Sequence, residues 1–383
     1  MKICAIICEY NPFHNGHLYQ LNEAKKLSKA DAIVCFMSGN FVQRGESALL
    51  DKYTRAKHAV LSGADVVIEL PTVFATSNAE LFARGAIQLI SAIPSVKTLA
   101  FGAENVDKLA FISASRYLNN EPEEVSKNIK ASLALGVSYA KARTQAYAGF
   151  IPMDLLCSPN NILGLEYTRA LQRKNSDVDI LPIQRIGGGY TEETLQPKYS
   201  SATAIRKHLE DTTALKDSVP AYVLEDLPSS QEQRILEKIE KYALLSRTSE
   251  EIARVCDCSE GLENALKKAS QSAEPLETAL TSARYTASRI RRIALQNLLQ
   301  IDETLIRQSL ESDLYLRVLA VKENRSDVLS VLSESKSPLI IRAHDENKLN
   351  DVAKRCFEKD VFAEKVYSLI NSMQMTDKSI FTK

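Results

Sequence analysis

The feature that most constrains the fold is a regular alternation of short apolar runs with segments of helical periodicity. Five runs of strand length occur, namely Ile3 to Cys8, Ala32 to Met37, Val66 to Leu70, Leu99 to Phe101 and Ile180 to Ile183. Helical patterns begin near Gly16, Lys52, Ala79, Val106 and Asn161. Strands separated by helices are typical of a parallel sheet with covering helices. This pattern predicts a Rossmann-like α/β domain that binds ligands at the carboxyl ends of its strands.

A pair of histidines occurs directly after the first of these runs, in Asn11-Pro12-Phe13-His14-Asn15-Gly16-His17. Because a helix follows, the imidazoles lie beside backbone N–H groups that are free to bind an anion. His14 and His17 can donate hydrogen bonds to phosphate oxygens as charge develops, and Gly16 lets the backbone approach a ligand. The alternative is a turn with two exposed histidines. The position after a strand favours a nucleotide triphosphate site.

Other distinctive segments follow the other predicted strands. Ser38 to Glu46 comes after the second strand, Pro71 after the third, Gly102 to Glu104 after the fourth, and Arg185 to Tyr190 after the fifth. We expect these segments to meet the histidines at one edge of the sheet, because parallel strands end together there.

Two further segments place polar side chains at predicted helix starts. Ser200, Ser201 and Thr203 precede Arg206, and the hydroxyl groups can cap free helix N–H groups. Asn160 and Asn161 follow Pro159 at another helix start, where either can act as a cap. Capping alone explains these residues unless a ligand is shown to contact them.

Length and composition indicate a globular protein with two domains. The chain has 383 residues, of which 45% are hydrophobic, so it exceeds one ordinary core and is not disordered. Prolines and clustered charges interrupt the helical signal near 216–233. We place a nucleotide-binding domain at 1–215, with a helical insertion at about 121–173, and an all-helical domain at 230–383. Within the latter, the apolar spacing of Leu314 to Val321 is also taken as helical.

The balanced charge means that any binding of nucleic acid depends on a local patch. The 48 basic and 48 acidic residues cancel. Thr281 to Gln296 contains four arginines and no acid: Arg284, Arg289, Arg291 and Arg292. The segment is either a solvated helix face or a phosphate-binding surface, and crowding of cations without counter-charges favours the second. Lys267 and Lys268 could extend this patch.

The sequence contains no sign of a structural metal or of a membrane anchor. Seven cysteines occur without a CxxC pair, and the spacing of Cys256-Asp257-Cys258 does not fit zinc. No carboxylate pair marks a dedicated metal site. No apolar run approaches the roughly 18 residues of a membrane span, and no signal peptide opens the chain. We therefore expect reduced thiols and a cytoplasmic location.

Several motifs together resemble a known family. The His14 to His17 motif resembles the HxGH signature of nucleotidyltransferases, and no KMSKS sequence of a synthetase accompanies it. The chain is also similar to the bacterial tRNA(Met) cytidine acetate ligase family, through segments that include Met37-Ser38-Gly39-Asn40, Gly63-Ala64-Asp65, Phe101-Gly102-Ala103-Glu104 and Asn160-Asn161-Ile162-Leu163-Gly164. The resemblance implies an enzyme that activates acetate with ATP. The acetyl group would then pass to N4 of the wobble cytidine (C34) of elongator tRNA(Met), giving N4-acetylcytidine.

The resemblance also assigns roles to particular residues. Catalysis is expected from His14, His17 and Arg206, with the arginine stabilising pyrophosphate as it leaves. ATP contacts are expected from Ile7, Cys8, Glu9, Tyr10, Asn11, Pro12, Phe13, His14, Asn15, Gly16, His17, Leu18, Tyr19, Gln20, Gly102, Asn160, Asn161, Arg185, Ser201 and Thr203. The tRNA surface would include Arg284, Arg289, Arg291, Arg292, Lys267 and Lys268. Mg²⁺ is expected to accompany ATP, since it bridges the triphosphate in such chemistry.

Two other functions remain open at this point. A small-molecule adenylyltransferase or a pantothenate-synthetase-like ligase would share the nucleotide motifs but would not need the arginine-rich helical part. A non-catalytic RNA-binding protein could keep the same fold without the reaction.

Overall fold

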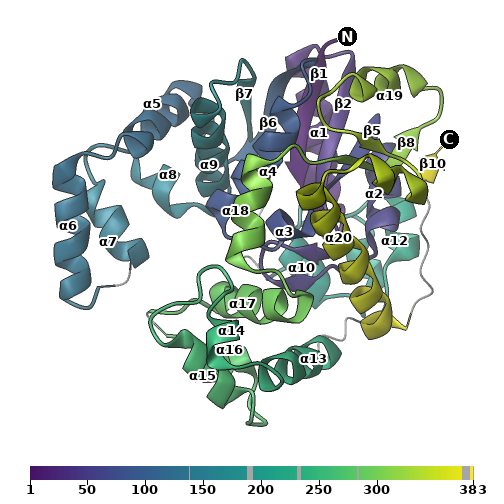
Figure 1. The fold of residues 1–383 in the computed structure, drawn as a ribbon. Helices are drawn as coiled ribbons and strands as arrows, with labels where there is room; N and C mark the ends of the chain where they lie inside the picture. Colours follow the sequence, from purple (N-terminus) through teal and green to yellow (C-terminus); the bar gives the residue numbers. More distant parts are fainter. Residues whose placement is uncertain (138, 188–192, 231–233, 283, 373–379, 383) are drawn as a thin grey trace.

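The central sheet confirms the five predicted parallel strands and their α/β setting. The computed structural model describes residues 1–137, 139–187, 193–230, 234–282, 284–372 and 380–382. The sheet has the strand order β10-β8-β5-β2-β1-β6-β7, with β9 paired to β8 (Figure 1). Its parallel part consists of β1 (Ile3–Cys8), β2 (Ala32–Ser38), β5 (Val66–Leu70), β6 (Val96–Ala103) and β7 (Asp179–Gln184). The carboxyl ends of β1, β6 and β7 are therefore adjacent.

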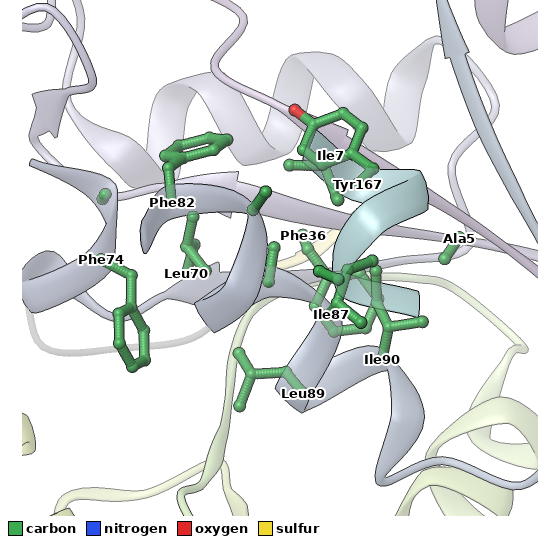
Figure 2. Packing of buried hydrophobic residues seen from close by; sticks show 14 of the residues in the cluster. Ala5, Ile7, Phe36, Leu70, Phe74, Phe82, Ile87, Leu89, Ile90 and Tyr167 are labelled. Carbon is green, nitrogen blue, oxygen red and sulfur yellow. The ribbon is translucent and has the colours of Figure 1, made fainter. Parts of the chain in front are cut away.

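Helices cover both faces of this sheet because alternate strand residues face opposite sides. Cys4 and Ile6 of β1 pack in a core with α1 (Asn15–Ser28) and α2 (Lys52–Leu61). Ala5 and Ile7 instead pack in a larger core with α4 (Ala79–Ser91), α5 (Lys108–Asn119) and α9 (Pro159–Arg173). Figure 2 shows part of the second core, in which side chains of β1, β2 and β5 cluster with those of α4.

The predicted insertion at 121–173 is helical. It contains α6 (Glu123–Ala134), α7 (Tyr139–Ala146), α8 (Met153–Cys157) and α9. Figure 1 shows α6 and α7 at the edge of the molecule, whereas α9 lies against the sheet. The last helix of the insertion therefore lies against the sheet.

The next part of the chain forms a helical module with a core of its own. It contains α13 (Arg234–Leu245), α14 (Ser249–Ile252), α15 (Leu262–Ala269), α16 (Leu276–Leu280) and α17 (Ala287–Leu299). Its core joins Leu244, Leu262, Leu266 and Ile290, among others. The helical module lies beside the strand ends in Figure 1.

The range 230–383 is mainly but not wholly helical, which corrects the expectation of an all-helical domain. Leu314 to Val321, expected to be a helix, contains β8 (Leu316–Lys322), which pairs antiparallel with β5. Two short strands join it, β9 (Leu339–Ile340) and β10 (Ile380–Thr382). A strand buried on both faces has an almost continuous apolar sequence, and periodicity alone does not distinguish it from a buried helix.

The remaining helices of this region also pack onto the nucleotide-binding half. They are α18 (Glu303–Glu311), α19 (Ser326–Ser333) and α20 (Asp351–Asn371), and they share the larger core with the sheet. Short helices complete the order: α3 (Thr72–Ala75), α10 (Ala202–Lys207), α11 (Thr212–Leu215), α12 (Ala221–Asp226) and the 3₁₀ turn Ala343–Lys348. No helix of the described ranges is both long and apolar enough to cross a membrane.

A buried ionic network joins elements from the N-terminal and C-terminal parts of the chain. Lys52 of α2 lies 3.0 Å from the carboxylates of Glu69 (β5) and Glu364 (α20). Arg317 of β8 lies 3.2 Å from Glu69 and 3.4 Å from Glu364. All four side chains are at most 6% exposed, so each charge depends on its partners for stabilisation.

Replacing Lys52 with methionine should therefore destabilise the fold strongly. We expect a loss of about 3 kcal/mol or more in the free energy of unfolding, since a buried carboxylate loses a partner. Lys127→Met is the control, because Lys127 and its partner Glu123 are 71% and 83% exposed. The control should change stability by about 0.5 kcal/mol at most. Urea denaturation of both variants measures the difference, and similar midpoints would contradict this account.

Candidate active site

A cleft opens at the carboxyl ends of the parallel strands, where the sequence predicted a ligand site. Its walls come from the segments after β1, β2 and β7, from the end of β6, and from the starts of α9 and α10. The lining residues are Ile7, Cys8, Glu9, Tyr10, Asn11, His14, His17, Gln20, Val42, Gln43, Arg44, Glu46, Phe82, Phe101, Gly102, Asn160, Leu163, Tyr167, Arg185, Ser201, Ala202, Thr203 and Arg206.

The two histidines face each other inside this cleft. Their rings stack with centroids 3.6 Å apart. His14 caps α1, and its Nδ1 accepts a hydrogen bond of 3.1 Å from the Gly16 N–H. The proton of the neutral ring therefore resides on Nε2, which makes that atom a donor. His14 is only 8% exposed, so the alternative of an exposed turn is wrong for this residue.

Both imidazoles are neutral at physiological pH. The pKa of His14 is lowered to about 3, first by burial and then by the charges of Arg185 and Arg206. The pKa of His17 is also well below its usual value, because of burial and the proximity of His14 and Arg185. The pair can donate hydrogen bonds but does not supply positive charge.

Positive charge in the cleft comes from arginines on three different segments, Arg44, Arg185 and Arg206. Arg206 donates a hydrogen bond of 2.6 Å to the carbonyl of Asn11, which fixes the arginine beside the histidine turn. Arg185 lies 3.7 Å from the Glu104 carboxylate. Guanidinium groups match phosphate geometry, so the cleft suits a polyanion.

Two carboxylates, Glu9 and Glu46, also line the cleft. Glu9 accepts a hydrogen bond of 2.7 Å from the Gln43 N–H, and burial raises the pKa of its carboxyl group. Within the described part of the chain, no group of three or more His, Cys, Asp or Glu side chains is arranged to hold a metal ion. All seven cysteines are free thiols.

The structure separates the two asparagines that the sequence could not tell apart. Asn161 is fully buried, and its Oδ1 accepts hydrogen bonds of 2.9 and 3.0 Å from the N–H groups of Glu104 and Asn105. Asn160 lines the cleft and donates to the Glu104 carboxylate. Asn161 therefore supports the loop after β6, and of the two asparagines Asn160 is the one that lines the cleft.

The segment before α10 combines a cap with cleft contacts. Ser201 caps α10 by accepting a hydrogen bond from the Ala204 N–H, and it also lines the cleft together with Thr203. Ser200 is buried and bonds to the Ser218 hydroxyl at 2.8 Å. The capping interpretation thus holds for Ser201, while Ser200 has a packing role.

Several predicted ATP residues lie outside the main cleft. Phe13 is buried, and the Asn15 side chain donates to the carbonyls of Lys198 and Asp217. Gly16 and Tyr19 line a smaller hollow beside Arg185. Pro12 and Leu18 do not line the cleft, and neither does Pro71, which was expected at the same edge of the sheet. Of the segment after β7, residues 188–190 lie outside the described residues.

The structure adds residues that the sequence analysis did not assign to the site. They are Val42, Gln43, Arg44, Glu46, Phe82, Phe101, Leu163, Tyr167 and Ala202. The sequence signal that could have identified the first four is the position of their segment directly after the second strand. The apolar ones were indistinguishable from core residues.

The arginines of the predicted basic patch have more partners within the protein than the sequence suggests. Acids from other segments pair with three of its arginines: Glu260 with Arg284, Glu46 and Glu277 with Arg291, and Asp257 with Arg292. Arg289 donates to the Asp257 carbonyl. The expectation of four cations without counter-charges is therefore wrong, because acidic residues distant in sequence supply the counter-charges.

The two lysines proposed to extend this patch differ in their surroundings. Lys267 donates to the carbonyls of Leu244 and Leu245 at the end of α13, so it acts as a helix cap. Lys268 is exposed.

Comparison with known proteins matches the chain over its whole length. The family model described as HIGH Nucleotidyl Transferase matches residues 1–380. A tRNA(Met) cytidine acetate ligase of Thermoanaerobacter sp. (strain X514) is 39% identical over 96% of this chain and 95% of the relative. The tRNA(Met) cytidine acetate ligase of Clostridium novyi (strain NT) is 36% identical, over 100% and 98%.

Solved structures agree with the fold. The apo crystal structure of Thermotoga maritima TmcAL superposes with a TM-score of 0.90 at 29% identity, covering 100% of both chains. The structure of the same protein bound with alpha-thio ATP has a TM-score of 0.87 at 28% identity, again over 100% of both chains.

The different positions of the asparagines predict different effects on stability. Asn161→Ala should lower the free energy of unfolding by about 1–3 kcal/mol, since two backbone N–H groups lose their acceptor. Asn160→Ala, its matched control, should stay within about 0.5 kcal/mol of the wild type. Chemical denaturation measures both, and equal losses would refute the division of roles between these neighbours.

Proposed function

This chain belongs to the tRNA(Met) cytidine acetate ligases within the HIGH nucleotidyl transferase family, and from this premise we propose how its cleft works. The protein is an ATP-dependent acetate ligase for a cytidine of tRNA(Met). We propose that it forms acetyl-adenylate and acetylates N4 of C34, and that it does so in the cytoplasm, where its tRNA substrate is found. The observation that carries this proposal is the cleft itself, in which arginines and neutral histidine donors converge at the strand ends.

The first step joins two anions. A carboxylate oxygen of acetate attacks the α-phosphorus of ATP, the bond to the bridging oxygen breaks, and pyrophosphate leaves. The cleft needs positioned donors and positive charge for this step, and no nucleophile of its own. Nε2–H of His14 and the ring of His17 serve as donors to the α-phosphate, while Arg206 and Arg185 hold the departing phosphates.

In the second step the amine of cytosine attacks the acetyl carbonyl carbon. The new N4–C bond forms, the C–O bond to AMP breaks, and N4 loses a proton to the released phosphate or to water. The base must be extruded from the anticodon to reach the adenylate.

The remaining cleft residues form the adenosine part of the site in this proposal. Gly102 is informative, because a Cβ built there would meet only Arg185 and Gln20 side chains, at 3.5 and 3.8 Å. The protein itself therefore has room for a side chain at this position. The advantage of glycine is that it leaves this space to the bound ligand. Asn160, Ser201 and Thr203 complete the proposed contacts.

The donor set also suits Mg²⁺ that arrives with ATP. Such an ion is usually held by phosphates, water and one or two carboxylates. Glu9 and Glu46 are the carboxylates of the cleft that could supply these ligands. The ion would neutralise charge on the triphosphate.

For tRNA, we propose that Arg284, Arg289 and Lys268 contact the backbone. Arg291, Arg292 and Lys267 instead hold protein segments together, as described above. The exposed cations of the insertion are the alternative surface, namely Lys127, Lys130 and Lys141 together with the partly exposed Arg143.

Labelled acetate, incubated with ATP and bulk tRNA, tests the proposal. Label in tRNA(Met), recovered as N4-acetylcytidine, supports it. Label only in a soluble product would indicate a small-molecule ligase, and no label would indicate a non-catalytic RNA-binding protein.

Within this assay His14→Ala and His17→Ala should each lower the rate of acetyl-adenylate formation by about a hundredfold or more, since each removes a donor to the transition state. Affinity for tRNA should stay near the wild-type value. Acetyl-adenylate formed at the wild-type rate in both variants would remove the histidines from the mechanism.

Replacing both Arg284 and Arg289 with glutamine should weaken tRNA binding and spare acetyl-adenylate formation. The slope of log affinity against log salt should fall by roughly one per lost phosphate contact. Arg307→Gln, which removes an exposed cation on α18, is the control and should keep the slope. Titrations at several salt concentrations measure it. An unchanged slope in the double variant would mean that these arginines do not contact tRNA, and the contact would then be assigned to the insertion.

A further inference from the structure

A second cavity lies directly beside the cleft, between the helical module and a short hairpin. The hairpin consists of β3 (Phe41–Val42) and β4 (Glu46–Ser47). The cavity is lined by Gly45 and Glu46 of the hairpin and by residues of α13, α16 and α17. Glu46 lines both the cavity and the cleft, so the two hollows are adjacent at this side chain.

The helical module is docked tightly on this hairpin. Gly45 has φ = 76°, and a Cβ there would lie 2.5 Å from the backbone N of Arg292. Arg291 donates to the Arg44 carbonyl at 3.2 Å and pairs with Glu46 at the same distance. The position of the cavity relative to the cleft is therefore fixed by backbone contacts.

Glu240 of α13 is the unusual residue of this cavity. It is 6% exposed, and its Oε1 has no hydrogen-bond partner among the residues that the structure describes. The other acids of the cavity are satisfied: Glu237 pairs with Lys241, and Arg291 pairs with both Glu46 and Glu277. An unpartnered buried carboxyl group costs stability, so its presence indicates a ligand.

The chemistry of Glu240 suits a nucleobase. Burial and then the nearby Glu237 raise the pKa of its carboxyl group well above the usual value, against the opposing effect of Arg291, and this favours the protonated form. A protonated carboxyl group offers a donor and an acceptor side by side. These match N3 and the N4 amino group of cytosine, and acidic side chains are known to accept from cytosine N4.

The size and the walls of the cavity fit one aromatic ring. Its volume is about 170 Å³, and an apolar cavity of about 150 Å³ is known to hold benzene. Apolar side chains from three helices form part of its walls, beside the charged residues already named; they are Leu236, Leu276, Ile290 and Ala294. Flipped bases are read in this way, by hydrogen bonds to the Watson–Crick edge and by apolar walls.

We propose that this cavity is the subsite for the acceptor cytosine of the tRNA, with Glu240 holding its N3 and N4 edge next to the cleft. The inference rests on the proposed function, because that function requires an extruded cytosine beside the adenylate. Glu240 is a positioning residue, since it binds the base and takes no part in bond making.

Two substitutions test the proposal. Glu240→Met removes the polar group at similar size, whereas Glu240→Gln keeps one donor and one acceptor. For Glu240→Met we expect unchanged or higher stability, unchanged acetyl-adenylate formation, and at least tenfold slower transfer to tRNA. Glu240→Gln should restore most of the transfer rate. Glu263→Met, on α15 of the same module, is the control and should transfer normally.

Direct titration with cytidine provides a readout that does not depend on the reaction. The wild type and Glu240→Gln should bind cytidine, and Glu240→Met should bind it at least tenfold more weakly. Equal cytidine binding by all three proteins, or normal transfer by Glu240→Met, would overturn the subsite. A Glu240→Met protein that fails to fold would also overturn it, because the carboxyl group would then be structural. A wild type that binds cytidine but does not label tRNA would refute only the proposed function.

Discussion

The structure depends above all on the buried ionic network of Lys52, Glu69, Arg317 and Glu364. Opposite charges must remain paired here, because these side chains are at most 6% exposed. The pairing brings β8 and α20 from the end of the chain onto β5 and α2. It also shapes the site, since a Cβ on Gly39 would lie 2.5 Å from the Glu69 carboxylate. Only a glycine can therefore begin the loop that leads from β2 to the cleft.

A second buried cation, Arg55, positions the chain segments that form the walls of the cleft. Its guanidinium donates to the carbonyls of Glu9, Ser38 and Gly39, which lie where β1 and β2 end. Burial lowers the pKa of this arginine, and the nearby acids oppose the change. The walls that carry the histidine turn and the hairpin are thus tied through backbone atoms. Their spacing depends on one fully buried side chain, that of Arg55.

The cleft divides its electrostatic tasks between residue types. Arginines supply positive charge, whereas burial keeps the histidines neutral, and the hydrogen bond from the Gly16 N–H fixes which nitrogen of His14 carries the proton. The helical module adds a surface and a cavity that a nucleotide fold lacks, and α17 locks both onto the hairpin. In the proposed function, the chemistry on ATP and the capture of a base thus belong to different parts of the molecule.

The sequence by itself determined the parallel strands, the helices between them and the edge at which the histidines lie, because hydrophobic periodicity and strand-end motifs are local signals. It did not determine that Leu316–Lys322 is a strand, since a doubly buried strand and a buried helix have similar apolar sequences. Nor did it separate Asn160 from Asn161, reveal the partners of Arg291, or mark Glu240 as unsatisfied. Those properties depend on neighbours that are distant in the chain, and only the tertiary structure decides which neighbours these are.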